Sequence, residues 1–352
     1  MEPFVYEALS SRVVFGRGRI SEARDELEKL GAKRALVLST PEQEKDAQAL
    51  ASSLGPLAGG VFSQAAMHTP VDVTNQAMVV VSDKSIDAVV SIGGGSTIGL
   101  GKAIALRTDM PQLAIPTTYA GSEMTPIIGQ TEDGVKTTQT TLKVLPETVI
   151  YDPELTYTLP SFIAGPSAMN AIAHSVEALY AQDRNPIVSM LAQASIEALA
   201  TAVPNLMSDT LDSEARANAQ YGAWLAGACL ASVGMAIHHK ICHTLGGTFD
   251  LNHGAVHCLM IPYTAAYNRD HASEAMKQTA SALGVDDAPG GLYDLMLLSN
   301  KQKSLRDFGL TESDLDRAAT LAVKNPYYNP RPVEKDAIRS MLQDAFEGVR
   351  PM

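Results

Sequence analysis

The chain has 352 residues, 45% hydrophobic and 19% charged, and is long enough for one large or two medium domains with a sizeable core. Its formal net charge of −12 disfavours nucleic acid or an anionic membrane as a partner, but leaves an anionic substrate possible inside a cleft. Three cysteines without CxxC spacing disfavour a disulfide framework or a zinc ribbon, so we expect buried free thiols.

We see neither a signal peptide nor a membrane-spanning segment in the sequence. The first residues show no basic region followed by an apolar core, so they do not resemble a signal peptide. The longest apolar stretch, at 223–237, is rich in small residues and, at about 15 residues, too short to span a bilayer. Together with the cysteine usage, these features predict a cytoplasmic protein.

The first half of the chain alternates β-like runs with helical ones. Strands are predicted at 34–40, 60–64, 87–95 and 112–118, and helices at 41–55, 71–85 and 96–108. Such alternation predicts a parallel sheet covered by helices on both faces. The segment 5–18 is expected to form a small separate hairpin.

From about residue 160, alanine, leucine and methionine dominate and β-branched runs fade. Helices are predicted at 165–181, 189–207, 213–235 and 273–284. Prolines 153 and 160 bracket a connector, which places the boundary between an α/β domain, 1–157, and a helical domain, 158–352. A cleft between two such domains is a common place for a ligand.

A glycine-rich turn ends the strand predicted at 87–95. Gly93, Gly94, Gly95 and Ser96 lie between that strand and the next helix, where free N–H groups can cradle a phosphate. The spacing matches neither a Walker A loop nor GxGxxG in register. A tight turn without a ligand therefore remains an alternative.

A second polar turn strengthens the case for a dinucleotide site. Thr117, Thr118, Tyr119 and Ser122 crowd the end of the neighbouring strand. After the strand at 34–40 the chain has Thr40 with no Asp, so NADPH is possible beside NADH.

Asn170 and His174 lie four residues apart in a predicted helix, so their side chains share one face. His239, His243 and His253 follow at spacings of four and ten. Such a group could hold a divalent metal, could be a metal site that lost its metal, or could be only a polar patch.

Several motifs together resemble the iron-containing alcohol dehydrogenase superfamily: "GGGS", "PTT", "NAIAHSVEA" and "HHKICHTLGGTFDLNHG". The resemblance implies a Rossmann-like α/β domain followed by an all-α domain, as in dehydroquinate synthase. Metal-dependent members bind iron or zinc through an Asp-x-x-x-His pair and two later histidines. Here these positions are Asn170, His174, His239 and His253, and an amide replaces the one negative ligand.

More specific stretches, "AHSVEALYAQDRNP" and "TPIIGQTEDGVKTT", resemble the maleylacetate reductase branch of that superfamily. The branch implies NADH- or NADPH-dependent reduction of maleylacetate to 3-oxoadipate during aromatic-ring degradation, without a catalytic metal. By analogy it also implies a homodimer. A metal-dependent alcohol or glycerol dehydrogenase, a dehydroquinate synthase-like lyase and a dinucleotide-binding module without activity remain alternatives.

The proposed reaction assigns candidate roles to the polar residues. Lys240 could bind a substrate carboxylate or the enolate oxygen, and the histidines could donate hydrogen bonds or a proton near neutral pH. For the proton we favour His243, then His253. Asn170 can donate through its amide and His174 could orient it, while Tyr119 could touch both cofactor and substrate. Lys143 on the connector is a candidate for the cofactor, with a solvated surface lysine as the alternative.

Overall fold

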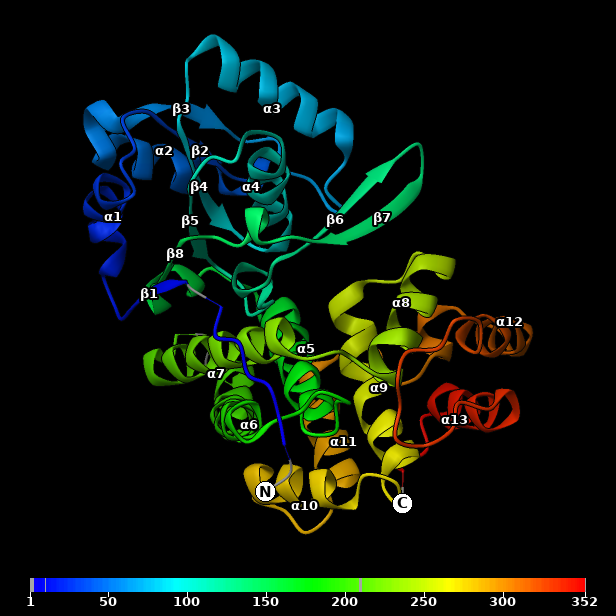
Figure 1. The fold of residues 1–352 in the computed structure, drawn as a ribbon. Coiled ribbons are helices and arrows are strands. Elements are labelled where there is room, and N and C mark those ends of the chain that lie inside the picture. The colour runs from blue at the N-terminus through cyan, green and yellow to red at the C-terminus, as the bar shows by residue number, and fades with distance from the viewer. Residues whose placement is uncertain (1–2, 10, 209–210, 352) are drawn as a thin grey trace. The chain divides into compact units, whose positions relative to one another are not determined.

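The structure, a computed structural model, describes residues 3–9, 11–208 and 211–351. It divides into two compact units. The sheet unit is Leu9–Thr158, and the helical unit comprises Leu159 onward with the described residues up to Ala8. Figure 1 shows the parallel strands gathered in the first unit and the long helices in the second.

The sheet unit is built on six parallel strands. In spatial order these are β1 (Arg12–Phe15), β8 (Thr148–Tyr151), β5 (Gln112–Pro116), β4 (Ala88–Gly93), β2 (Ala35–Leu38) and β3 (Ala58–Phe62). The helices of this unit are α1 (Ala23–Lys29), α2 (Glu44–Leu54), α3 (Val71–Asp83) and α4 (Gly95–Thr108). The predicted α/β fold with a parallel sheet is confirmed.

Strand β2 shows why helices must cover both faces of this sheet. Ala35 and Val37 join the core that includes residues of α1 and α2, whereas Leu36 and Leu38 join the core that includes residues of α3 and α4. All four side chains are fully buried. Alternate residues of a strand point to opposite faces, so an unbroken apolar strand is stable only between two helical layers.

Two parts of the sheet unit differ from the sequence-based expectation. The segment 5–18 contains no hairpin among its described residues, because β1 pairs in parallel with the distant β8. A hairpin lies instead between β6 (Ile127–Glu132) and β7 (Val135–Thr140), where no strand was predicted. Its turn has Asp133 and Gly134 at positive φ, a pair of residues that favours a tight hairpin.

The helical unit consists of long, closely packed helices. They are α5 (Ser161–Ala178), α6 (Pro186–Ser208), α7 (Ser213–Ser232), α8 (Ile237–Phe249), α9 (His253–Asn268), α10 (Ser273–Leu283), α11 (Ala288–Ser299), α12 (Glu312–Ala322) and α13 (Lys335–Glu347). Helix α5 contacts α6, α7, α9 and α11, and from Ala164 onward almost all of its residues are buried. A polar side chain on α5 therefore faces other protein groups and not solvent.

Helix α6 is the longest apolar helix of the described chain. By length and composition it could cross a membrane, and α7 with α8 would qualify only as a pair bent by 98°. This differs from the expectation that the stretch at 223–237 is the longest apolar segment. In the structure α6 contacts α5, α7, α10 and α11, as a core helix does.

Candidate active site

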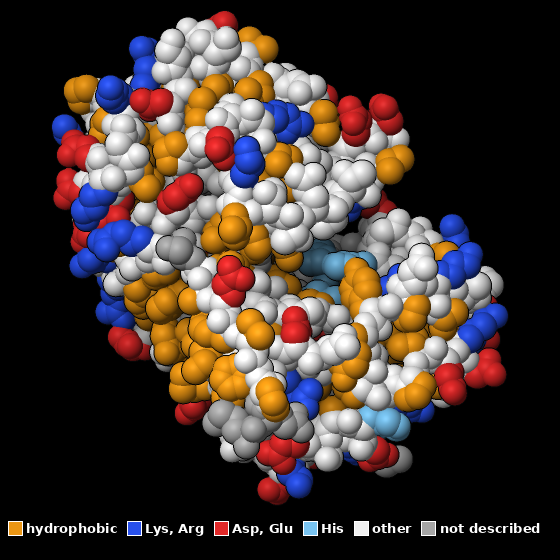
Figure 2. All heavy atoms as spheres, viewed as in Figure 1, with side chains coloured by type: hydrophobic (Ala, Val, Ile, Leu, Met, Phe, Trp, Pro, Cys, Tyr) orange, Lys and Arg blue, Asp and Glu red, His pale blue; other side chains and the backbone are white. Residues whose placement is uncertain are grey.

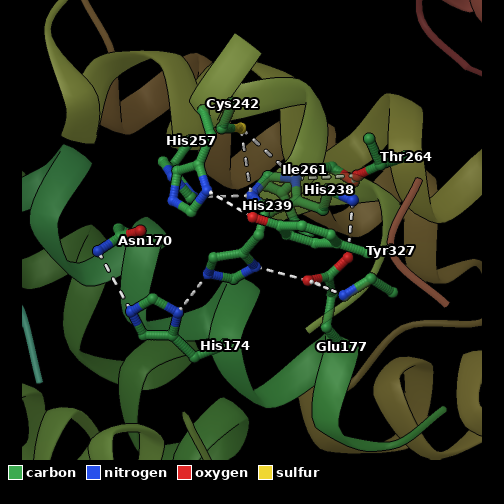
Figure 3. Close-up of polar contacts among 12 residues, drawn as sticks. Asn170, His174, Glu177, His238, His239, Cys242, His257, Ile261, Thr264 and Tyr327 are labelled. Carbon is green, nitrogen blue, oxygen red and sulfur yellow. Dashed lines mark hydrogen bonds and ion pairs between the residues drawn. The ribbon is translucent and has the colours of Figure 1, made fainter. Parts of the chain in front are cut away.

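A buried chain of hydrogen bonds connects α5 to α8 (Figure 3). Asn170 Nδ2 lies 3.4 Å from His174 Nε2, and His174 Nδ1 lies 2.8 Å from His239 Nε2. His239 Nδ1 in turn lies 2.5 Å from Glu177 Oε2. None of the four side chains is more than 5% exposed. The structure thus brings three of the predicted residues together and adds a carboxylate that the sequence analysis had not considered.

Glu177 also holds the first turn of α8. Its two carboxylate oxygens accept hydrogen bonds from the backbone N–H groups of Ala236, at 2.9 Å, and His238, at 2.7 Å. Ala236 is the N-cap residue of α8 and has no side-chain cap of its own. A carboxylate at a helix N-terminus satisfies orphan N–H groups and favours the helix dipole. Glu177 therefore fixes both the helix and one of its histidines.

A second buried pair, His238 and His257, lies beside this chain. His238 Nδ1 lies 3.0 Å from Thr264 Oγ1, and His238 Nε2 lies 3.0 Å from His257 Nδ1. Burial lowers the pKa of both histidines well below the ordinary value, and the neighbouring histidines lower it further. Both rings are therefore neutral near pH 7. The other nitrogen of His257, Nε2, is buried with no hydrogen-bond partner among the described residues.

His238 and His257 also form, with Cys242, a group whose possible ligand atoms lie within 4.8 Å of one another. The Cys242 sulfur lies 3.6 Å from His238 Nε2, and burial raises the pKa of this thiol well above its usual range. Both His238 nitrogens are already used in hydrogen bonds. This group is therefore better described as a neutral polar cluster than as a cation site. Like Cys229 and Cys258, Cys242 is a buried free thiol, as expected.

Other predicted residues lie at the exposed edge of the cluster. His243 Nδ1 is 3.4 Å from the hydroxyl of Tyr327, and Lys240 Nζ lies 5.7 Å from the centre of the Tyr327 ring. The His253 ring lies 4.2 Å from the buried His257 ring and stacks on His243 at 6.1 Å. Figure 2 shows histidine side chains gathered at the surface of the helical unit. The outer groups can meet a ligand, and the inner groups support them.

Sequence reasoning missed Glu177, His238, His257, Thr264 and Tyr327. A spacing signal existed for two of them, because Glu177 lies three residues after His174 and His257 lies four after His253. Such spacings place side chains on one helical face. No local pattern marks Tyr327, which lies in an irregular segment far along the chain.

In the sheet unit, the predicted glycine turn lies at the N-terminus of α4. Gly94 is the N-cap residue, and no side chain caps the helix. A Cβ on Gly94 would lie 2.9 Å from Thr118 Cγ2, and one on Gly93 would lie 2.4 Å from Thr97 Oγ1. A Cβ on Gly95 would meet no atom within 4 Å. The glycine turn is therefore tightly packed at Gly93 and Gly94 but open at Gly95. Ser96 follows in the first turn of α4. This geometry suits an approaching phosphate.

The segments that follow β2 and β5 lie beside the glycine turn and add polar side chains at the same end of the strands. Chain order reverses between β2 and β4, since β2 continues to β3 on one side and β4 lies on the other. Gln43, just after β2, donates to Thr117 Oγ1 at 3.0 Å and so joins the ends of β2 and β5 across Gly93. Ligands of open α/β sheets bind at such switch points.

The turn after β2 carries an acidic side chain that the sequence analysis overlooked. The exposed carboxylate of Glu42 lies two residues beyond Thr40, whose hydroxyl donates a hydrogen bond to it and lowers its pKa. In dinucleotide-binding sheets a carboxylate at this strand end binds the ribose hydroxyls.

A buried lysine fixes the loop after β5. Lys102 Nζ donates to the backbone oxygens of Ser122, Thr125 and Ile127 at 2.6 to 2.9 Å. Burial lowers the pKa of Lys102 to about 7, although Glu123 opposes this shift. Since Lys102 is on α4, it ties the Ser122 turn to the helix that begins at the glycine turn.

Two predicted residues lie away from these turns. Tyr119 is fully buried, and its hydroxyl donates to Thr156 Oγ1 at 3.3 Å. Lys143 is exposed with its Nζ 3.6 Å from Asp109, the C-cap residue of α4. That end of the helix is about 20 Å from the glycine turn, at ~1.5 Å of rise per residue. The structure does not bring Lys143 to the turn, and the roles given to both residues stay predictions.

Comparison with known proteins places these sites in a family context. Residues 10–153 match the sequence model described as iron-containing alcohol dehydrogenase, and residues 165–346 match the one for the C-terminal part of that family. The maleylacetate reductases of Rhizobium sp. and Burkholderia cepacia are 54% and 51% identical over 351 residues, 100% of both chains in each case. The crystal structure of maleylacetate reductase from Agrobacterium tumefaciens superposes with a TM-score of 0.97, at 54% identity and 100% coverage of both chains.

Proposed function

The chain belongs to the iron-containing alcohol dehydrogenase family, and we propose that it reduces the carbon–carbon double bond of maleylacetate to give 3-oxoadipate, with NADH or NADPH. The observation that carries this function is the likeness to maleylacetate reductases over the whole chain. The resemblance inferred from the glycine turn and the histidine segments is thus confirmed. Residues 1–157 are proposed to bind the dinucleotide and residues 158–352 the substrate, in a cytoplasmic homodimer.

The chemistry of the substrate defines what the site must provide. Maleylacetate is a dianion whose alkene is conjugated to a ketone. When bound, the reduced nicotinamide supplies a hydride to the alkene carbon β to that ketone, negative charge develops on the ketone oxygen, and the adjacent carbon takes a proton. The protein must therefore bind two carboxylates, stabilise an enolate and deliver one proton.

The exposed edge of the histidine cluster provides groups for these tasks. Lys240 is proposed to bind a carboxylate or the enolate oxygen, because its ammonium lies beside the Tyr327 ring, whose hydroxyl is 3.4 Å from His243 Nδ1. His243 is proposed to deliver the proton, with His253 as the second candidate. Both lie at the exposed edge, where they can exchange protons with solvent. The neutral His238 and His257 keep the interior free of competing charge.

The glycine turn is proposed to hold the cofactor pyrophosphate against the first turn of α4. We expect Gly95→Ala to raise the KM for NADH about tenfold, since the methyl group would displace a phosphate oxygen and lose about 1.4 kcal/mol of hydrogen bonding. Thermal stability is expected to stay unchanged, because a Cβ there meets no atom within 4 Å. Steady-state kinetics and a melting curve test both. An unchanged KM would place the pyrophosphate elsewhere.

The carboxylate of Glu42 is proposed to favour NADH over NADPH, because it would repel a 2′-phosphate at this strand end. We expect Glu42→Gln to raise the ratio of kcat/KM for NADPH to that for NADH about tenfold, because the variant removes the repulsion between this carboxylate and the 2′-phosphate. Glu44→Gln, an exposed change two residues further on, is the matched control and should leave the ratio unchanged. A similar ratio in both variants would remove Glu42 from cofactor selection.

The family name raises the question of a metal ion. The positions that ligate metal in metal-dependent members supply here one amide and three imidazoles, with no carboxylate among them. The His239 Nε2 lone pair faces His174 at 2.8 Å, and Glu177 is engaged with three N–H donors. These contacts do not suit a tightly bound dication and support catalysis without one.

The function and its proposed independence of metal are tested in one assay. Purified protein is expected to oxidise NADH or NADPH when maleylacetate is added, measured at 340 nm, and EDTA is expected to leave the rate unchanged. Absence of turnover would contradict the function. Inhibition by chelator that Fe²⁺ or Zn²⁺ reverses would contradict only the proposed metal independence.

A further inference from the structure

We infer that Glu177 is a positioning residue that sets the direction of the hydrogen bonds running from Asn170 through His174 and His239. This inference rests on the proposed function of the same site and adds the group that orders it. The dashed lines of Figure 3 follow this chain from the amide to the carboxylate.

The direction begins at Glu177. Its oxygens accept from the backbone N–H groups of Ala236 and His238, and the ring Nδ1 of His239 lies 2.5 Å from Oε2. The two backbone groups cannot change their role, so they hold the carboxylate in place as an acceptor. His239 Nδ1 must then carry a proton, and in the neutral ring its Nε2 is an acceptor.

The far end of the chain fixes the same direction. With His239 Nε2 as the acceptor, the His174 Nδ1 that lies 2.8 Å from it must carry a proton. His174 Nε2 is left as an acceptor and faces the Asn170 amide nitrogen at 3.4 Å, which can only donate. In this order both rings carry a proton on Nδ1, the nitrogen nearer to Glu177 along the chain.

This order of protons decides which group the Asn170 amide presents. With its amide N–H groups held toward His174, Asn170 keeps Oδ1 as a buried acceptor that has no hydrogen-bond partner among the described residues. Reversing the direction of these hydrogen bonds would turn the Asn170 amide, so that its N–H groups take the position of Oδ1. Glu177 touches neither reactant in this scheme and acts through His239, as residues behind a ligand or catalytic imidazole commonly do.

Glu177→Met is the variant that removes the ordering group. Methionine offers no acceptor to His239 Nδ1, so a proton on that nitrogen would lose its partner. His239 is expected to move its proton to Nε2, and His174 is expected to follow. We expect kcat to fall about 10- to 100-fold, the usual effect of losing such a supporting group, with little change in the KM for NADH.

The experiment is ¹⁵N NMR of the histidine rings in the full chain labelled at histidine, without substrate, combined with steady-state kinetics. Wild-type His174 and His239 are expected as Nδ1–H tautomers, and the Glu177→Met variant is expected to show Nε2–H for both. Glu177→Asp keeps the charge and should retain the wild-type tautomers and part of the rate. Ser175→Ala on the same helix, which removes a buried 2.8 Å hydrogen bond to Ser195, controls for lost stability and should not alter either tautomer.

The outcomes separate this inference from the function. Unchanged tautomers in a folded Glu177→Met variant, or an Nε2–H His239 in the wild type, would overturn the positioning role. If the variant does not fold, the wild-type spectrum still tests the positioning role, because it shows whether His239 carries its proton on Nδ1 or on Nε2. A wild type with the expected tautomers but no turnover of maleylacetate would contradict the function and not the order of the chain.

Discussion

Asn170→Asp is expected to lower kcat/KM for maleylacetate about a hundredfold, because a new buried negative charge near a dianion costs several kcal/mol, and ~3 kcal/mol corresponds to this factor. Asn170 is only 5% exposed, so solvent screens such a charge weakly. The carboxylate would also face the Nε2 lone pair of His174, where the amide now donates at 3.4 Å. Steady-state kinetics with maleylacetate and NADH measure the loss.

A neutral variant separates charge from hydrogen bonding. Asn170→Ala removes the donor without adding a carboxylate, and its kcat/KM is expected to fall less than that of the Asp variant. The Asp variant is also expected to gain affinity for Zn²⁺, measured by calorimetry, because its carboxylate supplies the anionic ligand that the wild type lacks. Wild-type activity in the Asp variant would contradict the electrostatic argument. Tight Zn²⁺ binding by the wild type at these side chains, with a rate that rises with occupancy, would contradict catalysis without a metal.

Lys240→Met is expected to reduce kcat/KM for maleylacetate by about two orders of magnitude, since a charge-assisted hydrogen bond to a carboxylate or enolate contributes ~1.5–3 kcal/mol. Lys240 is half-buried, with its ammonium 5.7 Å from the centre of the Tyr327 ring. The methionine side chain keeps the apolar stem, so the fold should be retained. The measurement is steady-state kinetics with varied maleylacetate at saturating NADH.

Two further variants test this assignment. Lys240→Arg keeps the positive charge and is expected to recover part of the activity, but not all of it, because the guanidinium has a different shape. Lys277→Met removes an exposed lysine of α10 and should leave kcat/KM unchanged. A Lys240→Met enzyme within threefold of the wild type would exclude Lys240 from substrate binding.

The strands and helices of the core were largely predictable from the sequence. The run at 87–95 is apolar and ends in glycines, and it forms β4 and the start of α4. The hairpin was missed because β7 (Val135–Thr140) is exposed at every position and has no apolar face. The pairing of β1 with β8 was also missed, since the two strands are separated by most of the sheet unit.

The candidate site was predictable in residue type but not in arrangement. The four-residue spacing correctly placed Asn170 and His174 on one helical face, because this spacing is a property of the helix itself. The spacing could not show that His239 is buried while His243 is exposed. These two side chains lie one turn apart on α8, and only the neighbouring helices decide which of them meets solvent.

The sequence alone thus determined the fold class, the family and the chemical nature of the site, since these depend on periodicity and on residue types at short spacings. Only the tertiary structure decided which groups touch. Glu177 and His239 are 62 residues apart, and they meet because α5 is buried against the helices around it and brings the carboxylate to the N-terminus of α8. Burial and the direction of hydrogen bonds depend on such contacts between distant segments, which no local pattern of residues encodes.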